Sequence, residues 1–143
     1  MQSMTDIGAI ITSEYAAATN TSGAPIVVVS GGAGDGVANT GKGIDTQGYK
    51  SIQFVVAALA ALTDTKVLTL AVEYQESDDN STFDTAVALQ AATTLLTGET
   101  GGTNESGAVT FDINLRKGKV FKRYIRFNFT PVLDAGATDE AAA

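Results

Sequence analysis

Apolar and polar residues alternate along much of this chain, which predicts that it folds mainly into β-strands. The cleanest period-two pattern runs from Val109 to Leu115, where Val, Phe, Ile and Leu alternate with Thr, Asp and Asn. A second alternating stretch runs from Lys119 to Thr130 and places three phenylalanines on one face. The residues between them, Arg116 to Lys119, have the composition of a turn, so the two stretches are predicted to form a β-hairpin.

Four further segments have strand character. Pro25 to Ser30 is rich in β-branched residues, and Tyr49 to Leu62 has the composition of a buried strand. Lys66 to Gln75 alternates and is predicted to form a hairpin with the strand before it. Phe83 to Leu96 has partly helical spacing, but its paired threonines and the glycine that follows favour an extended strand.

Two glycine-rich stretches, Gly31 to Gly48 and Thr97 to Gly107, are predicted to be loops. Short strands separated by Gly, Asp and Asn turns are typical of an antiparallel β-sandwich or barrel, which we expect to be jelly-roll-like. The 143 residues suffice for one domain with its own core. We expect an N-terminal arm or edge strand over 1–24, the β domain over 25–133, and a flexible Ala-rich tail over 134–143.

The composition excludes the commonest catalytic chemistry. The chain has no His and no Cys, so neither a Ser–His nor a Cys–His nucleophile can form within it. No other acid/base motif is recognisable, and we expect neither an enzyme nor a bound cofactor. The longest apolar run, Phe54 to Leu62, is far shorter than the ~20 residues that span a bilayer. No signal peptide is recognised, so we predict synthesis in the cytoplasm and no membrane association.

Positive charge is concentrated late in the chain. Residues 116–126 hold six bases and no acid, whereas residues 1–115 hold three bases and thirteen acids. Nucleic-acid binding is not expected, because it requires a basic face across much of a domain. Two interpretations of the basic strand remain. It lies beside acidic strands of its own sheet, where opposite charges attract, or it docks on an acidic partner surface.

Two loops resemble ligand sites without completing their motifs. Gly36 to Lys42 matches most of a P-loop, but Gly43 stands where a Ser or Thr would hold magnesium, and no helix pattern follows. Asp78 to Asn80 offers oxygen ligands for calcium, but the EF-hand spacing and the bidentate Glu are missing. Because Asp and Asn favour tight turns for backbone reasons, we predict a solvated turn there and leave calcium open.

Three segments between Tyr49 and Thr130 carry a family resemblance: Tyr-Lys-Ser-Ile-Gln-Phe-Val-Val at 49–56, Gln-Glu-Ser-Asp-Asp-Asn-Ser-Thr-Phe at 75–83, and Lys-Arg-Tyr-Ile-Arg at 122–126. Through these segments the chain resembles small β-rich head proteins of tailed phages. Several such proteins are decoration, or cement, proteins encoded near the major capsid gene. The resemblance implies a viral structural protein on the capsid exterior of the virion, bound to the major capsid protein as a dimer or trimer.

Under this resemblance four cations are the candidate partner-binding residues: Arg116, Lys122, Arg123 and Arg126. The Arg-Tyr-x-Arg strand also resembles the last strands of carbohydrate-binding β-sandwiches. Tyr124, between two of these arginines, is either a stacking platform for a ligand or part of the core. The alternative function is therefore a carbohydrate-binding or tail-associated adhesion module.

Overall fold

A computed structural model describes residues 27–29, 35–115, 120–134 and 140–142. These residues form nine β-strands and no helix, which confirms the all-β prediction. The strands are β1 (Val27–Val29), β2 (Asn39–Thr40), β3 (Ile44–Asp45), β4 (Ser51–Leu62), β5 (Val67–Ser77), β6 (Val87–Thr97), β7 (Thr103–Asn114), β8 (Tyr124–Asp134) and β9 (Glu140–Ala142).

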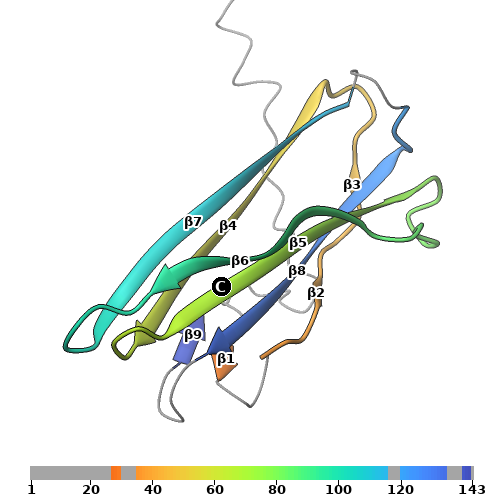
Figure 1. The fold of residues 1–143 in the computed structure, drawn as a ribbon. Coiled ribbons are helices and arrows are strands. Elements are labelled where there is room, and N and C mark those ends of the chain that lie inside the picture. The colour runs from red at the N-terminus through yellow and green to blue at the C-terminus, as the bar shows by residue number, and fades with distance from the viewer. Residues whose placement is uncertain (1–26, 30–34, 116–119, 135–139, 143) are drawn as a thin grey trace, which may run out of the picture.

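The strands form two sheets, which Figure 1 shows as two layers. The four-stranded sheet has the order β1-β9-β4-β7. The five-stranded sheet has the order β2-β8-β5-β6, with β3 also paired to β8. Every pairing is antiparallel. The architecture is therefore consistent with the predicted β-sandwich, whereas the sheets do not close into a barrel.

Both predicted hairpins are wrong. The strand β4 pairs with β7 along its whole length, and β5 pairs with β8 and β6 in the other sheet. The connections after β4 and after β7 therefore cross between the two layers. The alternation shows which residues of a strand face the core. Those residues are the same whether the strand joins the sheet of the preceding strand or crosses to the opposite sheet. The pattern alone could not distinguish the two arrangements.

Two predicted loops contain strands. The stretch Gly31 to Gly48 includes β2 and β3, which pair with β8, and β7 begins at Thr103 inside the second predicted loop. The pairing of the first stretch is made largely by backbone groups, since the N–H groups of Gly36 and Gly41 donate to carbonyls of β8. Backbone pairing of this kind leaves no alternating side-chain pattern for sequence reasoning to detect.

The termini were predicted as an arm and a tail. The arm over residues 1–24 lies outside the described residues. Within the predicted tail, Asp134 ends β8, and the three residues of β9 form a strand between β1 and β4. Pairing through backbone hydrogen bonds needs no alternating side-chain pattern, so this strand was not visible in the sequence.

The core lies between the two sheets in two adjoining clusters. The aromatic cluster contains Phe54, Val56, Leu70, Val72, Tyr74, Ile113, Ile125, Phe127 and Phe129. The aliphatic cluster contains Ala58, Ala60, Leu62, Leu68, Leu96 and Leu133. The Phe54 and Phe127 rings stack across the layers with centroids 4.3 Å apart and planes 5° apart. Leu68, Leu70, Val72 and Tyr74 are all buried, as the alternation of β5 predicts.

Candidate binding surface at the basic strand

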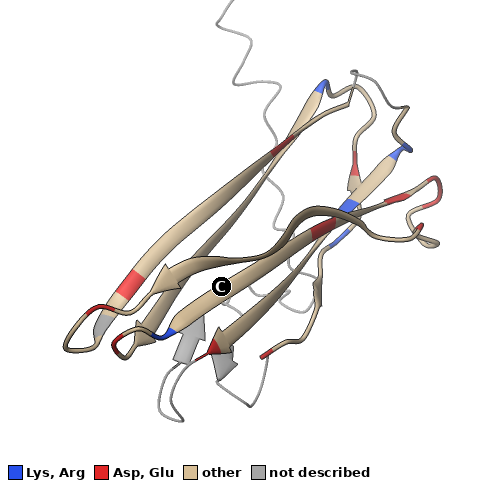
Figure 2. Cartoon of the chain, in the orientation of Figure 1, with Lys and Arg blue, Asp and Glu red and all other residues tan. Residues whose placement is uncertain are grey.

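The basic strand, Lys122 to Arg126, enters the five-stranded sheet beside the end of β5. Tyr124 lies opposite Ser77, and Arg126 lies opposite Gln75. The connection from β5 to β6, residues 78–86, folds beside this entry point. Figure 2 shows its acidic positions next to the basic start of β8. This confirms the first interpretation of the basic strand, which places it beside acidic segments of its own sheet.

Lys122 joins the two ends of the β5–β6 connection. Its Nζ lies 2.9 Å from Asp84 Oδ1 and 3.3 Å from Asp78 Oδ2. Its backbone N–H donates to Glu76 Oε1 over 3.2 Å. The hydrogen bond to Asp84, followed by the one to Asp78, raises the pKa of Lys122. The charge of this lysine is therefore engaged within the chain, where it holds a loop in place.

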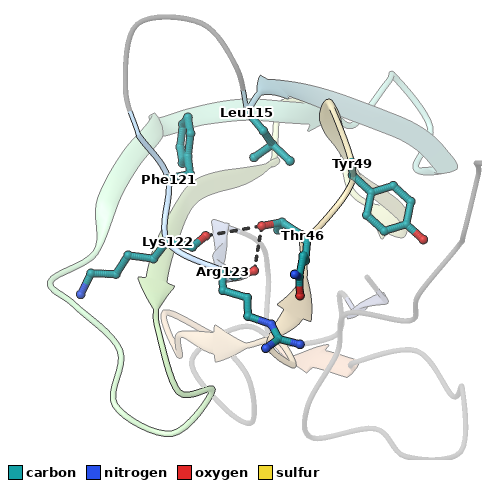
Figure 3. A pocket seen from close by; sticks show the side chains of 7 residues that line it. Thr46, Tyr49, Leu115, Phe121, Lys122 and Arg123 are labelled. Atoms are coloured by element: carbon teal, nitrogen blue, oxygen red, sulfur yellow. Dashed lines mark hydrogen bonds between the residues drawn. The ribbon is translucent and has the colours of Figure 1, made fainter.

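Arg123 is bound by Asp45 of β3 in a two-point contact. Its Nη2 lies 2.7 Å and its Nε 3.1 Å from Asp45 Oδ2. The hydrogen bond from Arg123, and then the one from the backbone of Gln47, lowers the pKa of the Asp45 carboxyl. The Thr46 hydroxyl donates to the Arg123 carbonyl over 2.7 Å (Figure 3). Both the charge and the backbone of Arg123 thus tie β3 to β8.

Arg126 differs from its two neighbours because it has no ion pair with any described acid. Its Nε donates to Gln75 Oε1 over 2.8 Å, and its guanidinium lies 3.9 Å from the centre of the Phe83 ring. Gln75 is held in turn by Asn128 and by the backbone of Asp84. Burial lowers the pKa of Arg126, although a guanidinium stays charged. Arg126 is therefore a partly buried cation that is held in position and has no carboxylate partner among the described residues.

The fourth candidate, Arg116, lies outside the described residues. Three residues were not predicted as contacts of the basic strand: Asp45, Gln75 and Phe83. Asp45 and Arg123 are 78 residues apart, and only the pairing of β3 with β8 brings them together. Gln75 and Phe83 are the first and last residues of the segment at 75–83 that carries the resemblance, but nothing in the sequence indicated that they contact Arg126.

The acidic turn is organised by its own backbone. Asp79 Oδ1 accepts hydrogen bonds from the Ser77 hydroxyl and from the N–H groups of Ser81 and Thr82, at 2.8–2.9 Å. These bonds, the one from Thr82 first, lower the pKa of Asp79 well below its usual range. Asn80 takes the left-handed conformation, with a φ of 59°. Asp79 therefore caps a turn, and no cluster of three or more potential metal ligands occurs in the described ranges.

The segment resembling a P-loop is also engaged in the sheet. Its residues Asn39 and Thr40 form β2, which pairs with β8, and the N–H of Gly41 donates to the Phe127 carbonyl over 2.8 Å. A phosphate loop instead turns its N–H groups toward the ligand and leads into a helix. This segment is an edge of the sandwich.

An open depression of about 480 Å³ lies beside the basic strand and is lined by Thr46, Gln47, Tyr49, Leu115, Phe121, Lys122 and Arg123. In Figure 3 the Tyr49 ring points away from its centre, and Leu115 and Phe121 lie on its wall. The guanidinium of Arg123 lies 5.1 Å from the centre of the Tyr124 ring and occupies one of its faces. That face of the Tyr124 ring is therefore not available for stacking on a sugar.

Comparisons with known proteins add no further identification. The chain matches no protein-family model, no curated protein and no solved structure. Within the described parts of the chain, no helix is long and apolar enough to cross a membrane.

Proposed function

We propose that this protein is a non-catalytic structural component of a tailed-phage particle that binds the major capsid protein on the outside of the capsid. Two observations support the proposal. The segments at 49–56, 75–83 and 122–126 resemble phage head decoration proteins, and the chain has the β-rich fold that this resemblance implies. A two-layer sandwich is a stiff module, suited to carrying load between neighbouring capsid subunits.

The observation that carries the proposed contact is the state of Arg126. Lys122 and Arg123 are both neutralised by acids of their own chain, whereas Arg126 is held by Gln75 and Phe83 and keeps its charge without a described acidic partner. A positioned arginine loses little conformational freedom on binding and pairs well with a carboxylate. We therefore assign Arg126 as the anchor for a carboxylate of the major capsid protein.

The overall charge of the chain restricts where such a contact can form. The formal net charge is −7, so most of the surface repels an acidic partner. A carboxylate of the partner must therefore reach the guanidinium of Arg126 itself, since the neighbouring Lys122 and Arg123 are already paired with acids. A single charged contact of this kind is weak. Many copies, bound as dimers or trimers to a repeating shell, would nevertheless remain bound through avidity.

The test is co-sedimentation of the purified protein with mature capsids that lack it. Arg126→Gln is expected to weaken binding at least about tenfold, because a charged contact at the interface is lost. Arg123→Gln is the matched control, since it removes the same charge from a side chain already paired with Asp45. Equal binding by the wild type and both variants would exclude Arg126 as the anchor. Failure of the wild-type protein to bind any capsid would contradict the proposed function.

A further inference from the structure

The connection between β2 and β3 lies along β8 beside Arg126 (Figure 1). The registers of β2 and β3 along β8 leave three residues, 41–43, opposite only two residues, 126–127. An extra residue of this kind is a β-bulge, which changes the direction of side chains at the edge of a sheet. The middle residue of the three is Lys42, which is exposed. Its backbone therefore lies about one strand spacing, or ~5 Å, from this part of β8.

The Phe83 ring joins this connection to Arg126. The Arg126 guanidinium lies 3.9 Å from the centre of the ring, and a Cβ added at Gly43 would lie 3.0 Å from Phe83 Cζ. The same Cβ would collide with Asn80 Oδ1, so the absence of a side chain at Gly43 lets the acidic turn lie against this connection. Gly43 and Arg126 thus contact opposite parts of one small cluster. Lys42 is the next residue, and its long flexible stem can carry the ammonium toward a ligand bound at Arg126.

Lys42 and Arg126 differ in mobility but share an unneutralised charge. Among the described residues, Lys42 forms no ion pair. Acids in the adjoining segments are already engaged, since Asp45 binds Arg123 and Asp79 accepts hydrogen bonds within its own turn. A guanidinium that is held in position and an exposed ammonium therefore lie at the same edge of the sheet.

One acid shares the outer face of the sheet with these cations. Glu73 lies opposite Asn128, and Gln75 lies opposite Arg126, so Glu73 and Arg126 are diagonal neighbours, with Cα atoms ~7–8 Å apart. Glu73 is half-buried and forms no ion pair with a described base. Its charge opposes the approach of an anion to Arg126. A ligand with two carboxylates offsets this repulsion if its second carboxylate reaches Lys42.

We propose that Arg126 and Lys42 form a two-cation site that binds two neighbouring carboxylates on an acidic segment of the partner. This inference rests on the proposed anchor at Arg126 and adds its second contact and the chemistry of the partner surface. It also assigns a role to the lysine of the segment that resembles a P-loop: the side chain binds carboxylates from the edge of the sandwich.

An NMR titration of the isotope-labelled full-length protein at low salt tests the site without capsids. The probe is capped tetraglutamate, and the matched probe with one acid is the capped peptide Gln-Glu-Gln-Gln. Tetraglutamate should shift the amide signal of Lys42 and the Nε–H signal of Arg126 in a saturable manner. Lys42→Gln should raise the dissociation constant of tetraglutamate at least about threefold and change that of the single-acid peptide less than about twofold. Arg126→Gln should weaken binding of both peptides.

Two further variants separate the site from general effects of charge and folding. Glu73→Gln should lower the dissociation constant of tetraglutamate about threefold, a gain that a misfolded variant would not produce. Lys66→Gln removes the same charge as Lys42→Gln at the opposite end of β5 and should leave the dissociation constant unchanged.

Three results would overturn the two-cation site: no saturable shift at Lys42 and Arg126, wild-type affinity for tetraglutamate in Lys42→Gln, or equal weakening by Lys66→Gln. The proposed function fails separately. A protein that binds tetraglutamate at this site but binds no capsid would contradict the proposed function and leave the two-cation site standing. Capsid binding that depends on Arg126 but is unchanged by Lys42→Gln would contradict the second contact alone.

Discussion

The two ends of the sandwich are stabilised in different ways. The aromatic end joins the sheets by stacked rings and bears a network of charged and polar contacts, with Lys122 and Arg123 each bound by acids. The aliphatic end packs alanine and leucine side chains, and its described ion pair, Lys66 with Asp134, is long at 3.8 Å and exposed. There the β4–β5 turn is held mainly by backbone hydrogen bonds around Thr63 and Gly98. The difference indicates that the aromatic end is the part of the surface where polar groups are held in fixed positions.

The largest expected effects come from truncating one buried side chain at each end. Phe127→Ala should lower the free energy of unfolding by about 3–5 kcal/mol, because Phe54 loses its stacking partner and a cavity remains. Leu68→Ala should lower it by about 2–5 kcal/mol through the cavity alone. Urea unfolding followed by circular dichroism measures both.

The same experiment tests whether the two ends form one cooperative unit. Since β5 and β8 run through both clusters, each variant should unfold in a single transition with an unchanged dependence on urea. Two separate transitions, or a loss below about 1 kcal/mol for Phe127→Ala, would contradict the description of a continuous core.

A smaller effect is expected at the acidic turn and depends on pH. Because the folded protein lowers the pKa of Asp79, this carboxylate contributes stability that is present above the pKa of the unfolded chain. The contribution is lost as the pH falls from about 4, the pKa of Asp in the unfolded chain, toward the lower pKa of Asp79 in the folded protein. Asp79→Asn should therefore be less stable than the wild type at neutral pH, and the difference should shrink at about pH 2. Urea unfolding across this range measures the difference.

The control for this effect lies at the aliphatic end. Asp64→Asn makes the same change in the turn between β4 and β5, where no described residue donates a hydrogen bond to the Asp64 side chain. Its stability difference from the wild type should not shrink with falling pH. A difference for Asp79→Asn that stays constant between pH 7 and about pH 2 would show that the side chain caps the turn equally well when uncharged.

The sequence predicted the positions of the strands better than it predicted which strands pair with each other. Alternation identified β5 and the buried face of β8 because half-buried strands must alternate. It could not show that β4 pairs with β7 across some fifty residues, since this partnership depends on how the layers stack. The short edge strands β2 and β3 were missed because they are held by backbone groups in a glycine-rich segment.

The candidate surface was predicted in part. The cluster of bases was visible from local composition, and its location beside acidic strands was one of the two interpretations that the sequence left open. The sequence could not distinguish Arg126 from Arg123, because Asp45 is distant along the chain. The same limit applies to the Gln75 and Phe83 contacts of Arg126. Which cation remains without an acid is a consequence of the fold, and the proposed anchor depends on it.

The most direct test of the proposed function is to count this protein in purified phage particles from cells that produce it. Quantitative mass spectrometry of gradient-purified virions gives its ratio to the major capsid protein. A lattice-bound decoration protein predicts on the order of one copy for every one to three capsid subunits. A few copies per particle would point to a tail or vertex component, and absence from the virion would contradict a structural role in the particle.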